Sequence, residues 1–450
     1  MHYLPASEDD KRAMLSAIGA ARVDELFKDI PPEIRCEKGL DIPAGLSEQE
    51  LKTRMAAMAA RNTAPGGAPC FLGAGAYDHF SPAAVDHLLS RTEFYSSYTP
   101  YQPEMSQGTL QSIFEFQTMM ADLTGMDVSN ASLYDGASAT AEAALMASRI
   151  RRGKKILVAR SIHPAYREVL GTYLRCLDLD TEEVPFGRDG RMDLEALSSA
   201  LCPDVCALLV GQPNFFGVVE DLPSIARSLE AVDKKPLLAV TVSEALSLAI
   251  LNAPGSSGAD IVAGDARSFG LPLGYGGPYL GFVTAKKAHI RQIPGRICGQ
   301  TTDEEGRRGF VLTLTTREQH IRRERATSNI CTNEGLCMLG ATIYLALMGR
   351  RGLTELARLN LSKSEYLKEA LAKRGITPLF DGPTFNEFAV KLPAGAASKA
   401  AEALAGAGMI GGYPLGGDYA DLQDGYLVCA TEQVRREDCD RFAEVLGGLK

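Results

Sequence analysis

Residues 260–270 (DIVAGDARSFG) and the glycine-rich run after them at 273–279 (LGYGGPY) are the stretch that decides the fold. The first predicts an apolar strand that ends in a turn carrying Asp265 and Arg267. Parallel α/β sheets bind their ligands at the carboxyl ends of the strands, so a reactive group would stand in this turn. Taken alone, the pattern is also typical of a purely structural loop.

Short apolar runs alternate with helical patterns around this stretch. The predicted strands are 156–159, 205–210, 237–242, 261–262 and 280–284, and the predicted helices are 106–125, 137–150, 193–201 and 222–231. Strands separated by helices imply right-handed crossovers, and both faces of the resulting sheet are covered. The sequence therefore predicts an α/β fold with one large, mostly parallel sheet.

Two further segments flank this region. Residues 1–63 predict an N-terminal helical arm, with helices at 8–27 and 46–61 and a capping box formed by Ser47 and Glu50. A run rich in proline and glycine begins the large α/β domain, which we place at 64–333. Residues 334–450 predict a small C-terminal α+β domain, with helices at 334–348, 353–374 and 396–407 and strands at 387–391 and 426–430.

The composition argues against several classes of protein. The net charge of −9, with 47 basic and 56 acidic residues, does not favour a nucleic-acid partner. No apolar run is long enough to predict a membrane span, and the N-terminus has no pattern of a targeting peptide. The ten cysteines lack the paired spacing of a zinc site and fit reduced thiols. We therefore expect a cytoplasmic protein without a bound metal.

Residues 134–140 (YDGASAT) predict a turn that opens a helix. Free backbone N–H groups at such a helix start bind phosphate well, and hydroxyl side chains beside them add hydrogen bonds. Gly136 and Ser138 are therefore candidate cofactor-binding residues. Small residues in front of a helix are also typical of tight packing, so both interpretations stay open.

Several long and unusual strings give the chain a family resemblance. They are 93–107 (EFYSSYTPYQPEMSQ), 211–217 (GQPNFFG), 264–278 (GDARSFGLPLGYGGP) and 316–333 (TREQHIRRERATSNICTN), supported by 411–415 and 430–432. Nearly end to end, the chain resembles the non-catalytic subunit (subunit 1) of the two-subunit P-protein family of the glycine cleavage system. The resemblance implies the fold of a fold-type I pyridoxal-phosphate (PLP) transferase.

The sequence lacks the lysine with which PLP would form a Schiff base. The cofactor needs a primary amine for its Schiff base, and alignment with the family's catalytic subunit places Arg267 where that lysine would stand. No lysine lies between Lys235 and Lys286, and a guanidinium stays protonated and is a poor nucleophile. The carboxylate expected on the ring nitrogen is also missing near Thr241, because Glu244 comes three residues late. We expect the partner subunit, and not this chain, to bind PLP covalently.

The resemblance also implies a reaction and partners. The catalytic subunit 2 would decarboxylate glycine with PLP and pass the aminomethyl group to the lipoyl arm of the H-protein, within an α2β2 heterotetramer. This chain would complete the active site of its partner. The loop with two prolines is the candidate for that role, through Tyr98, Thr99, Tyr101, Gln102 and Glu104. Such a loop is also typical of surface packing.

A basic segment supplies the remaining candidates. Arg317, Thr327, Ser328 and Asn329 would contact cofactor phosphate, glycine carboxylate or the acidic carrier protein, although the run is also typical of a solvated helix face. Further candidates for docking the carrier are Arg291, Arg296, Arg307 and Arg308. His163 is either a relic of the residue that stacks on the cofactor ring or a buried structural histidine.

Two alternatives from other classes remain. The first is a self-sufficient PLP-dependent decarboxylase or lyase that uses another lysine, for which Lys286 and Lys287 are the nearest candidates. The second is a non-catalytic regulatory scaffold that binds the partner without being needed for activity.

Overall fold

A computed structural model describes residues 5–36 and 39–449, and its contacts divide the chain into two compact units at Asn62/Thr63. The first unit contains α1 (Glu8–Ala17), two short 3-10 helices (Val23–Phe27 and Pro32–Ile34) and α2 (Glu48–Ala59). Ser47 and Glu50 form the predicted capping box of α2. The single helix predicted at 8–27 is wrong, because α1 ends at Ala17 and Gly19 follows with a left-handed φ of 73°.

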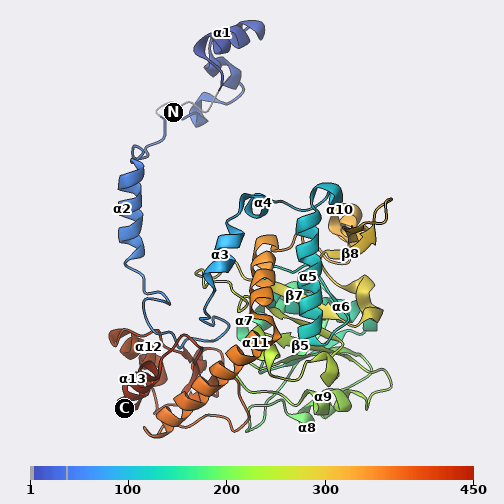
Figure 1. The fold of residues 1–450 in the computed structure, drawn as a ribbon, viewed down its shortest axis with the longest axis vertical. Coiled ribbons are helices and arrows are strands. Elements are labelled where there is room, and N and C mark those ends of the chain that lie inside the picture. The colour runs from blue at the N-terminus through green and yellow to red at the C-terminus, as the bar shows by residue number, and fades with distance from the viewer. Residues whose placement is uncertain (1–4, 37–38, 450) are drawn as a thin grey trace. The chain divides into compact units, whose positions relative to one another are not determined.

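A seven-stranded sheet forms the centre of the second unit (Figure 1). Its order is β1 (Val128–Ser129), β7 (Gly281–Ala285), β6 (Ile261–Asp265), β5 (Leu237–Val242), β4 (Val205–Gly211), β2 (Lys155–Ala159) and β3 (Asp180–Val184). The five strands from β6 to β3 are parallel, whereas β7 is antiparallel to both of its neighbours. The prediction of a mostly parallel sheet is confirmed.

Helices bury the sheet and explain its apolar strands. They are α5 (Gln107–Thr124), α6 (Gly136–Arg151), α7 (Pro164–Leu174), α8 (Leu194–Ala200) and α9 (Leu222–Leu229). Helix α6 packs across β4, β5, β6 and β7. Every residue of β4 and of β6 is buried, as expected for strands covered on both faces.

A smaller antiparallel sheet follows the long helix α11 (Gly335–Ala372), which has a non-helical residue at Gly349. The order of this sheet is β10 (Glu387–Lys391), β12 (Gly425–Cys429) and β11 (Tyr413–Pro414). Helices α12 (Ala397–Gly406) and α13 (Arg436–Gly447) pack beside it around a second hydrophobic core. The two predicted helices at 334–348 and 353–374 thus correspond to the two parts of α11.

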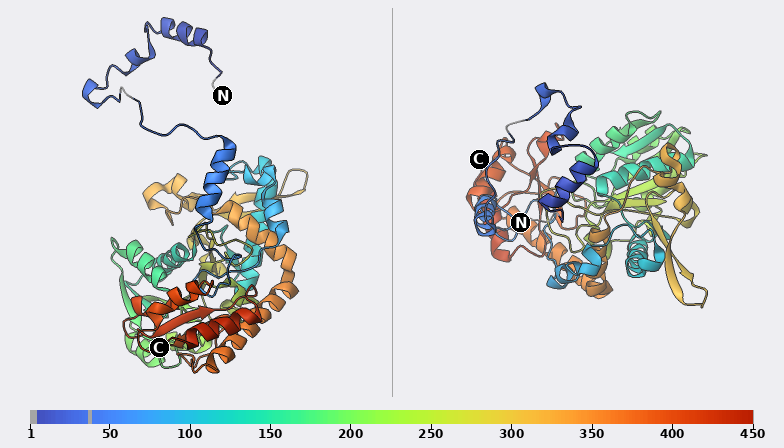
Figure 2. Two further views of the ribbon diagram at one scale, coloured as in Figure 1. Left: turned by 90° about the vertical axis from the view of Figure 1, so that its left-hand side faces the viewer. Right: turned by 90° about the horizontal axis from the view of Figure 1, so that it is seen from above.

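The segments that join these layers include elements that the sequence patterns did not predict. Helices α3 (Ala83–Leu89) and α4 (Thr92–Tyr95) precede α5, and α10 (Gln319–Arg322) precedes α11. Strands β8 (Ile297–Thr302) and β9 (Arg308–Thr313) form a hairpin that extends from the body of this unit (Figure 2). No helix of the described residues is long and apolar enough to cross a membrane.

A truncation in the centre of the large sheet tests this packing. Leu208 of β4 has no exposed surface and lies between β2 and β5. Leu208→Ala should lower the free energy of unfolding by about 3 kcal/mol, through lost apolar burial and the cavity left behind. Leu177→Ala is the control, because Leu177 is 47% exposed and its loss should cost less than about 0.5 kcal/mol. Equal shifts of the urea midpoint in the two variants would contradict this packing.

Candidate functional site

The turn after β6 buries the guanidinium of Arg267. The side chain is 2% exposed, and its Nη1 donates to the carbonyl of Leu271 at 3.2 Å. Its Nη2 donates to the carbonyl of Tyr77, and the guanidinium lies 5.6 Å from the ring centroid of Tyr279. The cation is therefore held by neutral backbone acceptors and an aromatic face, which is how a buried guanidinium is made tolerable.

The end of the adjacent strand β5 has no carboxylate at the position where a ring-nitrogen partner is expected. Thr241 is buried there and accepts a hydrogen bond from the hydroxyl of Thr140 at 3.3 Å. Glu244 follows three residues later and binds His79. Among the described residues, the end of β6 thus offers no amine for covalent PLP, and Thr241 in β5 offers no carboxylate for the ring nitrogen.

The lysine nearest to Arg267 in the sequence lies at the other end of β6. Lys286 follows β7 and pairs with Asp260, the residue immediately before β6. Because β6 and β7 are antiparallel, this pair is at the amino end of β6, opposite the turn that holds Arg267. The residues at the carboxyl end of the sheet do not fit a covalently bound PLP.

The start of α6 is capped by the chain's own carboxylates. Asp135 accepts a hydrogen bond from the Ser138 amide at 2.7 Å, and Asp265 accepts one from the Gly136 amide at 3.1 Å. Burial raises the pKa of Asp265 to about 6, although the Arg267 amide and charge favour its ionised form. The backbone amides of Gly136 and Ser138, which were predicted to bind phosphate, therefore donate to carboxylates of the same chain.

A buried ionic cluster lies beside this region. Both ring nitrogens of His79 contact carboxylates, Nε2 with Glu244 at 3.0 Å and Nδ1 with Glu432 at 2.9 Å. Burial alone would lower the pKa of His79, but the two carboxylates outweigh it and raise that pKa to about 9. At neutral pH the ring is therefore an imidazolium, which joins the end of β5 to the segment after β12.

The loop at 98–104 is largely exposed and lies against the start of α11. Tyr98 is 85% and Tyr101 55% exposed, and Gln102 and Glu104 are exposed as well. Tyr98 and Thr99 line a hollow of about 200 Å³ together with residues of α4, α5 and the start of α11. The hydroxyl of Tyr101 accepts a hydrogen bond from Arg296 at 3.3 Å.

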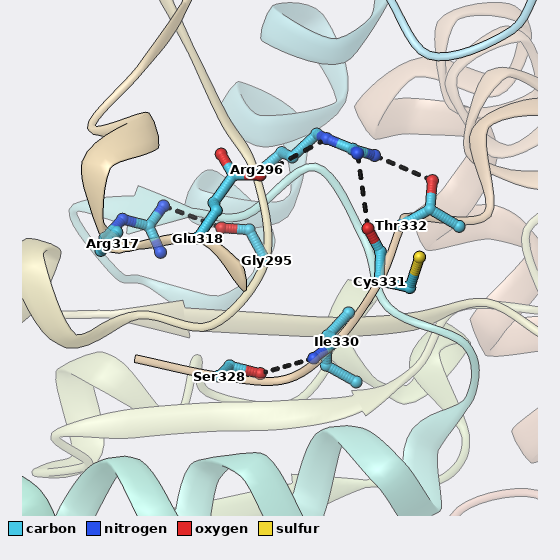
Figure 3. A pocket seen from close by; sticks show the side chains of 8 residues that line it. All are labelled: Gly295, Arg296, Arg317, Glu318, Ser328, Ile330, Cys331 and Thr332. Atoms are coloured by element: carbon cyan, nitrogen blue, oxygen red, sulfur yellow. Dashed lines mark hydrogen bonds and ion pairs between the residues drawn. The ribbon is translucent and has the colours of Figure 1, made fainter. Parts of the chain in front are cut away.

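Arg296 is the centre of a second group of polar residues (Figure 3). It is 4% exposed, and its guanidinium donates to the Thr332 hydroxyl at 2.8 Å while its Nε lies 3.6 Å from a Glu318 carboxylate oxygen. Arg317 beside it donates to the carbonyls of Ile293 and Gly295. Both arginines thus organise the segment between β7 and α11.

A basic hollow of about 220 Å³ opens next to this group. It is lined by Arg291, Leu314, Thr316, Arg317, Arg322, Arg325 and Thr327. The ion pairs nearby join Arg296 to Glu318 and Arg325 to Glu324, so Arg291 and Arg322 pair with no carboxylate among the described residues. The hollow therefore carries positive charge suited to a carboxylate or a phosphate.

Comparisons with known proteins identify the family of the chain. The family model of the glycine cleavage system P-protein matches residues 1–446. The chain belongs to this P-protein family. It is 49% identical to the "Probable glycine dehydrogenase (decarboxylating) subunit 1" of Geobacillus kaustophilus, over 99% of this chain and 98% of that one. The corresponding protein of Desulforamulus reducens is also 49% identical, over the full length of both chains.

A solved structure of the same family matches this P-protein chain over nearly its full length. The crystal structure of a glycine decarboxylase (P-protein) of the glycine cleavage system, in inhibitor-bound form, superposes with a TM-score of 0.90. It is 40% identical and covers 99% of both chains. A sphingosine-1-phosphate lyase of Burkholderia pseudomallei, at 16% identity and a TM-score of 0.66, shares the fold alone. The predicted fold-type I architecture is thereby confirmed.

The structure places His163 among buried groups of the P-protein chain. Its Nε2 donates to the carbonyl of Ala74 at 3.0 Å, its Nδ1 accepts from the Ala165 amide, and its ring stacks on Tyr166. Burial lowers the pKa of His163, so the ring is neutral at pH 7. The ring is half-buried and its contacts give it a structural role, whether or not it is also a relic of the stacking residue.

The sequence patterns of this P-protein chain do not predict the structural roles of His79 and Arg296. His79 was not singled out at all, and Arg296 was considered only as a docking residue for the carrier. Glu432, which contacts His79, lies 353 positions from it in the sequence, and Thr332, which accepts from Arg296, lies 36 positions from that arginine. Neither residue belongs to a recognisable motif, and no local signal in the sequence marks such pairs.

The charge on His79 gives the stability of the chain a defined dependence on pH. Its folded pKa of about 9 lies above the unfolded value of about 6.5. The stabilisation is therefore complete below about pH 6.5 and is lost as the pH rises through about 9. Its full size is on the order of 3 kcal/mol.

His79→Gln is the variant that tests this dependence. Burial also raises the pKa of Glu387 to about 8, so the contribution of Glu387 to stability falls with rising pH as well. The effect of His79 is therefore measured as the difference between the wild type and the variant. The difference between their melting temperatures should be large at pH 6 and shrink by pH 10. A difference that stays constant across this range would show that His79 is not charged in the folded state.

Proposed function

We propose that this chain is the subunit of a heteromeric glycine decarboxylase that keeps the PLP fold without binding PLP, and that its partner subunit holds the cofactor. One observation carries this: Arg267, the residue that the family resemblance aligns with the lysine, is buried and donates to two backbone carbonyls. The family membership and the 40% identical glycine decarboxylase structure support the reaction. PLP on the partner would supply the electron sink for loss of CO2 from glycine.

The proposal assigns the loop at 98–104 to the active site of the partner. Fold-type I enzymes close their sites with loops from a neighbouring subunit, as the family resemblance implies. Two prolines limit the conformations of this loop, and the contact between Tyr101 and Arg296 ties it to the body of the chain. Its exposed phenols, with Gln102 and Glu104, would then face glycine or the lipoyl arm, within an α2β2 assembly.

The basic hollow would bind an anionic group of the H-protein or of the substrate complex. Arg317 and Thr327 line it, while Ser328 and Asn329 follow in the same segment. Arg307 is paired with Asp303 and Glu305 at the hairpin tip, so Arg291 and Arg322 are the stronger docking candidates. Gly136 and Ser138, whose amides are engaged by Asp265 and Asp135, have a structural role in this proposal.

Reconstitution tests the proposed division of labour. Exchange of labelled CO2 into glycine should be measured with lipoylated H-protein for this chain alone, for the partner alone and for the two together. We expect exchange only in the mixture, and the visible absorbance of PLP only with the partner, because the turn after β6 carries the guanidinium of Arg267 and not an amine. Absorbance of PLP and exchange in this chain alone would refute the proposal. Full activity of the partner alone would refute it as well and would favour the alternative that this chain is a regulatory scaffold.

Charge removal in the hollow tests the docking role. In the reconstituted enzyme, the double variant Arg291→Ala/Arg322→Ala should raise the KM for H-protein roughly threefold to tenfold with little change in kcat, because two unpaired cations are lost. The effect should shrink as salt is added. Arg351→Ala is the matched control, since Arg351 is an exposed cation paired with Glu355 on α11. An unchanged KM for H-protein would exclude this surface from docking.

A further inference from the structure

The carboxylate of Asp265 connects two backbone turns. Asp265 ends β6, is 5% exposed, and accepts the Gly136 amide at 3.1 Å with Oδ2 and the Arg267 amide at 2.8 Å with Oδ1. The first of these amides belongs to the first turn of α6, where four N–H groups have no partner within the helix. The second opens the turn that replaces the lysine segment. One buried carboxylate therefore satisfies donors from both elements.

The space around this carboxylate is filled. A Cβ atom on Gly136 would lie 2.2 Å from the hydroxyl of Tyr166 and 3.0 Å from the Cβ of Asp265. Tyr166 is 8% exposed, and the guanidinium of Arg267 closes the side toward Tyr77. Asp135, which accepts the Ser138 amide of α6, adds a second carboxylate. A phosphate group could bind the Gly136 amide only by displacing the carboxylate of Asp265.

A helix start at the carboxyl end of a parallel sheet is the usual phosphate position in such folds, because its amides and dipole favour an anion. We propose that Asp265 is a built-in anion that occupies this position, so that the helix start is satisfied without a bound phosphate. The side chain supplies the charge and the acceptors that a cofactor phosphate would otherwise bring. This inference goes beyond the proposed function, because it concerns how this chain folds and would hold whatever the partner binds.

Removal of the carboxylate should therefore create a site for a small anion. In Asp265→Ala the amides of Gly136 and Arg267 lose their acceptor, while the Arg267 cation stays nearby. The melting temperature of the full chain should fall by roughly 3–5 °C. Formate, which is the missing carboxylate as a free ion, should restore at least half of this loss, and inorganic phosphate should act in the same direction if the vacated space admits it.

Asp260→Ala is the matched control. Asp260 is an aspartate of similar burial at the opposite end of β6, where it accepts the Leu238 amide at 3.0 Å and pairs with Lys286. Its loss should also destabilise the chain, but its carboxylate accepts an amide of strand β5 and none from the start of an α-helix, so formate should have no more effect than it has on the wild type. Once the basic hollow is neutralised by Arg291→Ala/Arg322→Ala, a chain that keeps Asp265 should likewise show no specific response to formate or to phosphate.

A second variant covers the case in which Asp265→Ala does not fold. Asp265→Asn keeps the shape and one acceptor oxygen, so it should fold with a smaller loss of melting temperature and a weaker response to formate. Specific stabilisation by phosphate of an Arg291→Ala/Arg322→Ala chain that keeps Asp265 would overturn the inference, because the position at the start of α6 would then be open. Failure of formate to stabilise either Asp265 variant more than Asp260→Ala would overturn it as well. Neither result depends on decarboxylation, so the two proposals fail separately.

Discussion

A buried guanidinium must have acceptors for its donors, and this requirement at Arg267 shapes the middle of the chain. The carbonyl of Tyr77 meets it from outside the sheet, which brings the segment around Tyr77 and His79 across the ends of β5 and β6. The Tyr77 hydroxyl then donates to Glu387 of β10 at 3.0 Å, and His79 binds Glu432. The cation thus links the large sheet to the small one through a single stretch of chain.

The sequence predicted the parts of this structure that depend on local patterns. The buried strands β4, β5 and β6 are continuous apolar runs, and the absence of lysine around Arg267 was visible at once. Strand β3 (DTEEV) was missed because its four leading residues are largely open to solvent and carry no apolar pattern. The roles of Asp265, His79 and Arg296 could not be predicted, because each depends on atoms that folding brings from distant positions.

Charged side chains in the interior are paired within the chain, whereas two arginines at the surface are not, over the residues that the structure describes. In the interior, each of the charged groups Arg267, His79 and Asp265 is matched by acceptors or donors of the same chain, so little is left for a ligand. At the surface, Arg291 and Arg322 stay unmatched among the described residues, in a chain of net charge −9. Cations left unpaired at a hollow are available to a partner.

The self-capped start of α6 has a consequence for the life of the protein in the cell. A PLP enzyme whose pocket is completed by its cofactor depends on the supply of vitamin B6 for its stability, because a bound ligand stabilises the folded state by mass action. A chain that carries its own anion at that position has no such dependence. If the partner alone binds PLP, as proposed, the level of this chain under vitamin shortage would follow synthesis and proteolysis alone, and the partner would limit the number of working complexes.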